Sequence, residues 1–255
     1  MDKYIYFTAT DTTRRVFDAL GADCHKCVNI SKSKPSDEVL CFCKDDVVYV
    51  GFPVFGGRVP AIVLERIDAL KGNGCKAIVV AVYGNRHYDD SIKEMQAFLE
   101  CHGCSVVAAI AAVAQHSMVP SIATGRPNAG DMARLREIKA EIDAKLASGT
   151  LIAMPKRPDE TYKEYRPLPI LPISTDECSS CGLCADECPV DAISLGPTCE
   201  TDATRCIICM RCVAVCPSKA RQLPPEMQQA VKARLESRCP VNREIELFFA
   251  DALSN

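Results

Sequence analysis

Eight of the 17 cysteines form two copies of one pattern, in the segments CSSCGLCADECP and CIICMRCVAVCP. Both copies read C-x2-C-x2-C-x3-C-P, and they begin at Cys178 and Cys206. In this pattern three thiolates converge on one cubane cluster, and the fourth cysteine, followed by proline, completes the other cluster. The spacing therefore predicts two [4Fe–4S] clusters with crossed ligands. The first site consists of Cys178, Cys181, Cys184 and Cys216, and the second site consists of Cys206, Cys209, Cys212 and Cys188.

Structural zinc is the alternative for the same cysteines, because CxxC pairs also bind zinc. Zinc sites usually use two separated pairs, so the repeated run of three short intervals favours iron–sulfur clusters. The segment 175–224 resembles the bacterial two-cluster ferredoxins, and all eight ligand positions are present. The resemblance implies a small α+β domain that carries electrons. Two other CxxC pairs, Cys24 with Cys27 and Cys101 with Cys104, are expected to be structural or incidental, although the first could be a redox pair.

Upstream of the cysteine blocks, unbroken apolar runs alternate with segments of helical periodicity. Such runs are typical of strands that are buried on both faces of a parallel sheet. We expect strands at 3–8, 47–52, 76–83 and 105–113, a short strand at 39–43, and helices at 12–20, 59–70, 89–101 and 131–146. The predicted fold class is α/β, with a doubly wound parallel sheet.

The predicted organisation has four parts. Residues 1–148 form the α/β domain, and 149–174 form a linker in which prolines lie among charged residues. Residues 175–224 carry the cysteine blocks. Residues 225–255 are expected to form a helical tail, with helices at 226–238 and 245–253.

A hydroxyl-rich loop follows the first predicted strand and precedes a helix. Such a loop can bind phosphate through hydroxyls, backbone N–H groups and the helix dipole. It resembles the flavodoxin phosphate loop T/S-x-T-G-x-T, with Asp11 where that family has glycine. The alternative is that Asp11 caps the helix. The residues implied in cofactor binding here are Thr8, Thr10, Asp11, Thr12 and Thr13.

Two further loops follow the third and fourth predicted strands. The carboxyl ends of parallel strands meet at one edge of a sheet, where ligands bind. These loops resemble the isoalloxazine-binding loops of flavodoxin-like proteins. The implied flavin contacts are stacking by Phe55 and by Tyr88 or Tyr83, and polar contacts from Gly84 and Asn85. The whole predicted set is Pro53, Val54, Phe55, Gly56, Gly57, Tyr83, Gly84, Asn85, Arg86 and Tyr88.

Two details of these loops complete the prediction. Gly56 and Gly57 could allow a peptide to turn over when the flavin is reduced, because glycine tolerates both signs of φ. Arg58 and Arg86 either contribute to the site or are solvated loop charges.

Over nearly its full length the chain resembles the flavodoxin–ferredoxin fusion proteins of anaerobes, the EFR-type ferredoxin family. The resemblance implies a flavodoxin-like domain with FMN and a ferredoxin domain with two [4Fe–4S] clusters. The expected function is electron transfer that converts between one-electron and two-electron chemistry. The partner would be a redox protein or a small-molecule acceptor, and the second case would make the chain an enzyme.

A rival interpretation is a ferredoxin-type carrier or assembly component whose flavodoxin-like domain is a docking module without flavin. Asp11 is the feature that favours it. Direct use of a nicotinamide is disfavoured, because the sequence has no G-x-G-x-x-G fingerprint.

Composition narrows the class of protein. A net charge of -3 and the lack of a long basic run give no reason to expect nucleic acid. The longest apolar run, 106–114, is far shorter than the roughly 20 residues of a membrane span, so no membrane is expected. The beginning of the sequence lacks the layout of a signal peptide, and half of the cysteines follow a metal-binding pattern. These features favour the reducing cytoplasm.

Overall fold

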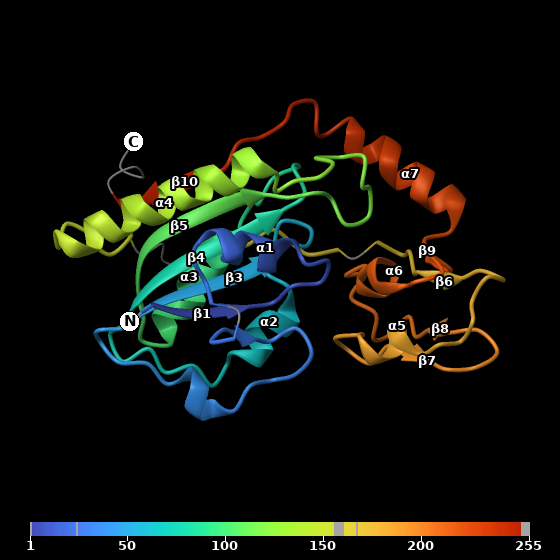
Figure 1. The fold of residues 1–255 in the computed structure, drawn as a ribbon, viewed down its shortest axis with the longest axis horizontal. Coiled ribbons are helices and arrows are strands. Elements are labelled where there is room, and N and C mark those ends of the chain that lie inside the picture. Colours follow the sequence, from blue (N-terminus) through green and yellow to red (C-terminus); the bar gives the residue numbers. More distant parts are fainter. Residues whose placement is uncertain (1, 24, 156–160, 167, 251–255) are drawn as a thin grey trace.

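The computed structural model describes residues 2–23, 25–155, 161–166 and 168–250. The described residues of 2–154 and 241–250 are here called the sheet unit, and residues 170–223 are called the cysteine unit (Figure 1). Within the described residues, no helix is both long and apolar enough to cross a membrane.

The sheet unit is built on six strands in the order β10-β5-β4-β3-β1-β2. The first five strands of the chain pair in parallel, and β10 pairs antiparallel with β5. The order 2-1-3-4-5 is that of the flavodoxin-like doubly wound fold, so the predicted fold class is confirmed. The strands are β1 (Asp2–Tyr6), β2 (Val28–Asn29), β3 (Val47–Pro53), β4 (Lys76–Tyr83), β5 (Ser105–Val113) and β10 (Glu246–Phe249).

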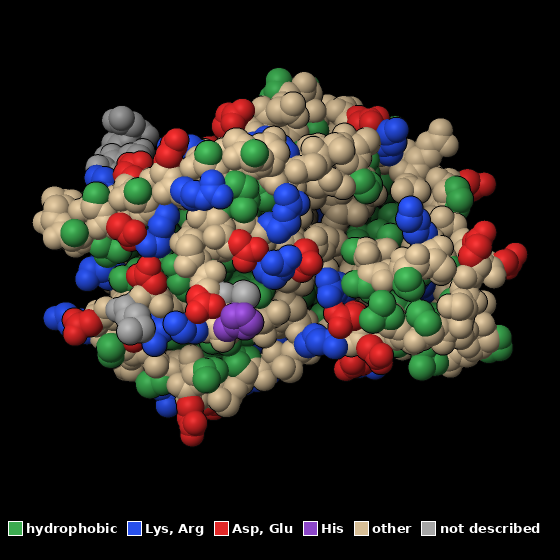
Figure 2. All heavy atoms as spheres, viewed as in Figure 1, with side chains coloured by type: hydrophobic (Ala, Val, Ile, Leu, Met, Phe, Trp, Pro, Cys, Tyr) green, Lys and Arg blue, Asp and Glu red, His purple; other side chains and the backbone are tan. Residues whose placement is uncertain are grey.

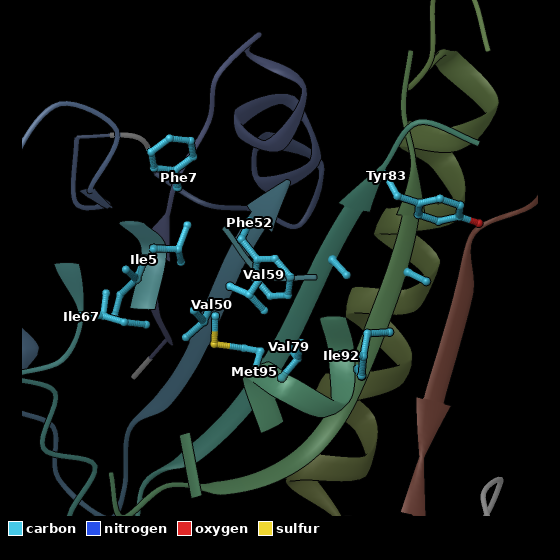
Figure 3. Close-up of a cluster of buried hydrophobic side chains, with 14 of the residues drawn as sticks. Ile5, Phe7, Val50, Phe52, Val59, Ile67, Val79, Tyr83, Ile92 and Met95 are labelled. Carbon is cyan, nitrogen blue, oxygen red and sulfur yellow. The ribbon is translucent and has the colours of Figure 1, made fainter. Parts of the chain in front are cut away.

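Helices cover both faces of this sheet, which is why the strands read as continuous apolar runs. Helices α1 (Thr12–Ala19) and α4 (Ala129–Ala147) pack on one face with Tyr49 and Val80. Helices α2 (Ala61–Arg66) and α3 (Ser91–Cys101) pack on the other. Figure 3 shows this second core, in which Met95 lies against Val50 and Val79.

Two predicted elements are wrong. The segment 39–43 is not a strand, because Asp37–Leu40 form a 3-10 helix, η1, and Cys41 makes only an isolated bridge to Lys71. The tail segment 245–253 is not a helix where it is described, because Glu246–Phe249 form β10; residues 251–253 lie outside the described residues. The first tail helix is correct and is α7 (Pro225–Glu236).

The β10 segment forms a strand instead of a helix because the outer edge of β5 offers backbone groups for pairing. Its alternation also fits a strand, since Phe248 packs with the core of α2 and α3 and Phe249 with the core of α1 and α4. The predicted helical tail therefore crosses back and completes the sheet of the N-terminal part.

The cysteine unit repeats one small motif twice. Helices α5 (Leu183–Asp186) and α6 (Arg211–Val215) each follow a residue in the left-handed conformation, Gly182 with φ 82° and Met210 with φ 64°. Two short antiparallel pairs flank the helices. They are β6 (Ile173–Ser174) with β9 (Arg221–Gln222), and β7 (Ile193–Ser194) with β8 (Glu200–Thr201).

The cysteine unit lies at the carboxyl ends of the parallel strands (Figure 1). Cys209 and Met210 belong to the same buried cluster as Phe7 and Ala9, which follow β1. Figure 2 shows cationic and acidic side chains gathered where the two units meet. Contacts across this boundary include Arg211 Nη1 to the carbonyl oxygen of Ala9 at 3.3 Å, Lys32 to Glu187 at 3.1 Å, and Arg66 to the carbonyl oxygen of Pro189.

Candidate metal and cofactor centre

The predicted second cysteine site takes thiols from both blocks. The pKa of Cys209 is raised to about 12, mainly by burial and also by the charges of Cys212, Cys188 and Cys206, while the backbone N–H of Arg211 acts in the opposite direction. Burial also raises the pKa of Cys206, on which Cys188 acts in the same direction. The four thiols thus form one electrostatic group that contains Cys188 from the first block. Crossed ligation needs this placement, and the ligand assignment itself stays a prediction.

The first cysteine site is more open. Cys181 is exposed, Cys178 is half-buried and Cys184 is buried in α5. The backbone N–H groups of Cys199 and Ser180 donate to the sulfur of Cys178 and lower its pKa to about 7. Such N–H donors stabilise thiolates and tune a cluster that they hold.

Cys216, the predicted fourth ligand of the first site, is also set among amide donors. Burial raises its pKa, but the backbone N–H groups of Arg221, Ala220 and Ser218 and the hydroxyl of Ser218 outweigh burial and lower it. Eight thiols, of which Cys178 and Cys216 accept from such donors, fit a pair of iron–sulfur clusters chemically. Among the described residues, no three His, Cys, Asp or Glu side chains lie close enough together to surround a single metal ion.

The phosphate-type loop after β1 contains buried hydroxyls that lack partners. Thr8 and Thr13 are buried, and neither Oγ1 atom has a hydrogen-bond partner. A buried hydroxyl without a partner is costly, so these two atoms fit a phosphate that accepts from them. The backbone N–H of Thr8 donates to Ser31 Oγ at 2.8 Å and holds the loop.

Asp11 is compatible with that loop although it replaces glycine. Its φ is 63°, the left-handed conformation that glycine and aspartate tolerate. The alternative that its side chain caps α1 is wrong, since it makes no capping hydrogen bond. The carboxylate is exposed and lies 3.5 Å from Arg14 Nε, so the negative charge is directed toward solvent and a cation.

The loop after β3 turns on Gly56 and Gly57. Their φ values of 59° and 91°, with reciprocal backbone hydrogen bonds between Phe55 and Arg58, form a tight turn that requires positive φ at both positions. A Cβ on Gly57 would lie 2.1 Å from Asp89 Oδ2, and one on Gly56 would lie 2.9 Å from Tyr165 Cδ2. The linker residue Tyr165 therefore covers this loop. Whether the glycine peptide turns over stays a prediction.

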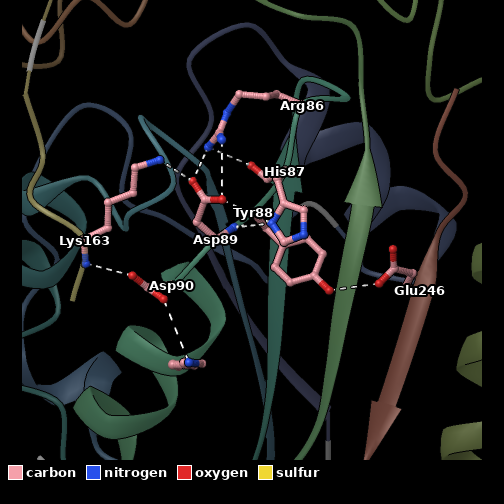
Figure 4. A network of polar contacts seen from close by, with 8 residues as sticks. Arg86, His87, Tyr88, Asp89, Asp90, Lys163 and Glu246 are labelled. Carbon is pink, nitrogen blue, oxygen red and sulfur yellow. Dashed lines mark hydrogen bonds and ion pairs between the residues drawn. The ribbon is translucent and has the colours of Figure 1, made fainter. Parts of the chain in front are cut away.

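The loop after β4 contacts the C-terminal segment (Figure 4). The hydroxyl of Tyr88 donates to Glu246 on β10 at 2.9 Å, and its ring stacks on His87 and meets Phe248 edge-on. Tyr83 ends β4 and is buried. The two rings also meet edge-on, with centroids 5.5 Å apart, and their stacking on a flavin stays a prediction.

Asn85, predicted to contact the flavin, is held by the segment that leads to β10. Its Nδ2 donates to the carbonyl oxygen of Val241 at 3.0 Å, and its Oδ1 accepts from the N–H of Arg243 at 2.9 Å. The two loop arginines are also engaged. Arg58 pairs with Glu94 at 2.6 Å, and Arg86 pairs with Asp89. Neither is a freely solvated charge.

Sequence reasoning missed four residues at the centre. Tyr165 could have been noticed as an aromatic residue in a proline-rich linker, and Cys199 is buried beside Cys178 and Cys184. His116 lies against Gly84; burial and then Arg86 lower its pKa to about 4, and its Nδ1 accepts from the N–H groups that follow, so the ring is neutral. No motif identifies His116 or the fourth residue, Arg221.

These features define a class of protein, a flavodoxin-like sheet joined at its carboxyl edge to a duplicated cysteine unit. The family model described as "4Fe-4S binding domain" matches residues 171–194 and 200–222. The chain is 46% identical over 50 residues to Ferredoxin-2 of Chlorobaculum tepidum. This alignment covers 17% of this chain and 81% of that protein. In its C-terminal part the chain belongs to the ferredoxin family, as a ferredoxin-type iron–sulfur electron carrier.

Other similar proteins match parts of the chain. A ferredoxin of Butyribacterium methylotrophicum is 59% identical over 32 residues, which is 12% of this chain and 58% of that protein. Two solved flavodoxins are structurally similar, each with a TM-score of 0.42. One is from the domain Archaea, with 12% identity over 57% of this chain and 98% of its own, and the other is flavodoxin 1 of Bacillus cereus, with 16% identity over 56% and 97%.

Proposed function

We propose that the chain transfers electrons between two [4Fe–4S] clusters and FMN. The observation that carries the proposal is the position of the second cysteine block. Cys209 and Met210 are buried in the same cluster as Phe7 and Ala9, so the second site lies against the sheet edge that carries the phosphate-type loop. Electron transfer needs such proximity and no general acid, base or nucleophile.

The two cysteine sites would act in sequence. The second site is the inner one, and the first site, with exposed Cys181, is the outer one. Leu183 and Leu195 of the cysteine unit are exposed and would contact a redox partner protein. If a small molecule is reduced at the flavin instead, the chain is an oxidoreductase.

The residues that would hold FMN are those of the three loops. Thr8 and Thr13 would donate their partnerless hydroxyls to the phosphate, and the turn at Gly56 and Gly57 would lie beside the ring system with Tyr165. Bound FMN exchanges one or two electrons, whereas each cluster exchanges one. Tyr165 lies beside Gly56 of the sheet unit, and burial and then the charge of Cys206 of the cysteine unit raise the pKa of its hydroxyl.

Anaerobic purification followed by reduction tests this function. The purified chain should show flavin bands near about 370 and 450 nm over a broad iron–sulfur shoulder. Two equivalents of a one-electron donor such as reduced methyl viologen should bleach the band near about 450 nm in the wild type. The same donor should bleach it much more slowly once the inner cluster is removed. A flavin that is reduced equally fast without that cluster would refute the route.

One observation favours the second candidate, a carrier whose sheet unit is a docking module without flavin. The side chain of Asn85 is already bonded to Val241 and Arg243, so its amide is not available to a flavin in this arrangement. A purified sample with the iron–sulfur shoulder alone, which binds no added FMN, would establish this function in place of the first.

A further inference from the structure

The cysteine unit contains a buried arginine without a carboxylate. Arg221 on β9 is 2% exposed. Among the residues that the structure describes, no Asp or Glu forms an ion pair with it. Its partners are four neutral oxygens and one thiol. They are Ser174 Oγ at 3.0 Å, the carbonyl oxygens of Cys199 at 2.8 Å and Pro172 at 3.1 Å, Thr201 Oγ1, and Cys212 Sγ at 3.8 Å.

A guanidinium cannot lose its proton in a protein, so this charge persists after burial. Burying an unpaired charge is strongly unfavourable, and neutral acceptors offset only part of the lost hydration. An anion close to Arg221 would remove the imbalance. The sulfur of Cys212 is the nearest candidate, and the positive charge of Arg221 acts on Cys206 as well.

The duplication makes this charge asymmetric. Arg221 and Ile193 occupy equivalent positions in the two blocks, since each follows the last cysteine of its block by the same number of residues. The guanidinium points to Cys212, a ligand of the second site, whereas only the backbone N–H of Arg221 donates to Cys216 of the first site. The second site therefore receives a full charge and the first receives an amide dipole.

We infer that Arg221 is the internal counter-ion of the second-site cluster and raises its reduction potential; this rests on the proposed cluster assignment. Reduction adds one electron, supplied by the donor, and increases the negative charge that the thiolates share. A fixed cation stabilises the reduced form more than the oxidised form. The electron would then reside on the inner site, next to the flavin loops, rather than on the outer one.

The test is a redox titration of the full chain followed by electron paramagnetic resonance. Arg221→Gln should disfavour reduction of one cluster about tenfold, a fall of about 59 mV for one electron, and leave the other potential unchanged. Repeating the substitution in Cys216→Ala, which keeps only the second site, assigns the shift. Arg205→Gln is the matched control, since the Arg205 side chain is exposed and pairs with exposed Asp191 at 3.8 Å.

Further variants make every outcome decisive. Arg221→Lys keeps the charge and should retain most of the potential. If Arg221→Gln and Arg221→Met cannot hold the second cluster but Arg221→Lys can, the need for a cation is supported. If all three lose it, or if both clusters are present in Arg221→Gln with unchanged potentials, the counter-ion role is overturned. Absence of [4Fe–4S] signals from the wild type would instead refute the proposed function.

Discussion

The two cysteine blocks have one ligand pattern but different residues between the ligands. The first block has Ser179, Ser180 and Gly182, where the second has Ile207, Ile208 and Met210. The apolar residues of the second block pack against the core of the sheet unit, whereas Ser179 is exposed. Ligand spacing defines a cluster site, and the intervening residues determine which site is shielded from water.

Met210 of the second block is buried although its backbone conformation is unfavourable for a non-glycine residue. It adopts φ 64°, whereas the matching residue of the first block is Gly182 with φ 82°. A non-glycine residue in this conformation is strained. The Met210 side chain is nevertheless 4% exposed, so its packing on the sheet unit offsets that strain.

The largest expected effect distinguishes the sites by their crossed ligands. Cys188 lies in the first block, but Cys188→Ala should remove the second-site cluster. The reason is that the thiol of Cys188 interacts electrostatically with those of Cys206 and Cys209. Iron should fall from about eight to about four atoms per chain, and the remaining cluster should be the outer one. Iron analysis and electron paramagnetic resonance measure both results.

The reciprocal variant is the control for this prediction. Cys216→Ala should leave about four iron atoms per chain, but in the inner site. Loss of the first-site cluster from Cys188→Ala would show that each block binds its own cluster. Zinc in place of iron in the wild type, purified without air, would remove the basis of both predictions.

The next effect follows from access of water and reagents. The outer cluster, the one left in Cys188→Ala, should be lost to an iron chelator or mild oxidant faster than the inner cluster left in Cys216→Ala. We expect a difference on the order of tenfold, because Cys181 is exposed and Cys209 is buried. The decay of the iron–sulfur absorbance gives both rates. Equal rates would mean that docking on the sheet unit does not protect the second site.

Features that depend on short-range pattern could be predicted from the sequence. The strands β3, β4 and β5 appear as apolar runs because both of their faces are covered, and the cysteine blocks show their chemistry through spacing. The phosphate-type loop could also be placed, since its position between β1 and α1 follows from those two elements.

Features that depend on long-range contacts could not be predicted. The segment 246–249 is a strand only because it meets the open edge of β5, which lies far away in the sequence. Tyr165 and Arg221 have no pattern of their own. Their roles come from the approach of a linker to a turn and from burial without a carboxylate.

A smaller effect is expected at the linker residue Tyr165, which lies beside the proposed flavin site. Tyr165→Ala should weaken FMN binding about fivefold, since an aromatic contact beside the turn at Gly56 would be lost. Quenching of flavin fluorescence measures the dissociation constant. Tyr162→Ala is the matched control in the same linker, because Tyr162 faces Arg58 at 5.0 Å instead. If the two variants bind FMN equally well, Tyr165 does not contact the flavin.

The smallest effect concerns Arg211, which occupies the position where the first block has exposed Leu183. Arg211 donates to the carbonyl oxygen of Ala9 in the phosphate-type loop and also pairs with Glu187, so the second block brings to that loop a cation that Glu187 partly balances. Arg211→Gln should weaken FMN binding about threefold and leave riboflavin, which lacks the phosphate, unchanged. The effect on FMN should shrink at high salt, because ions screen a partly exposed charge. Equal weakening of both flavins would mean that Arg211 only holds the two units together, and the charge difference between the blocks would then have no bearing on the cofactor.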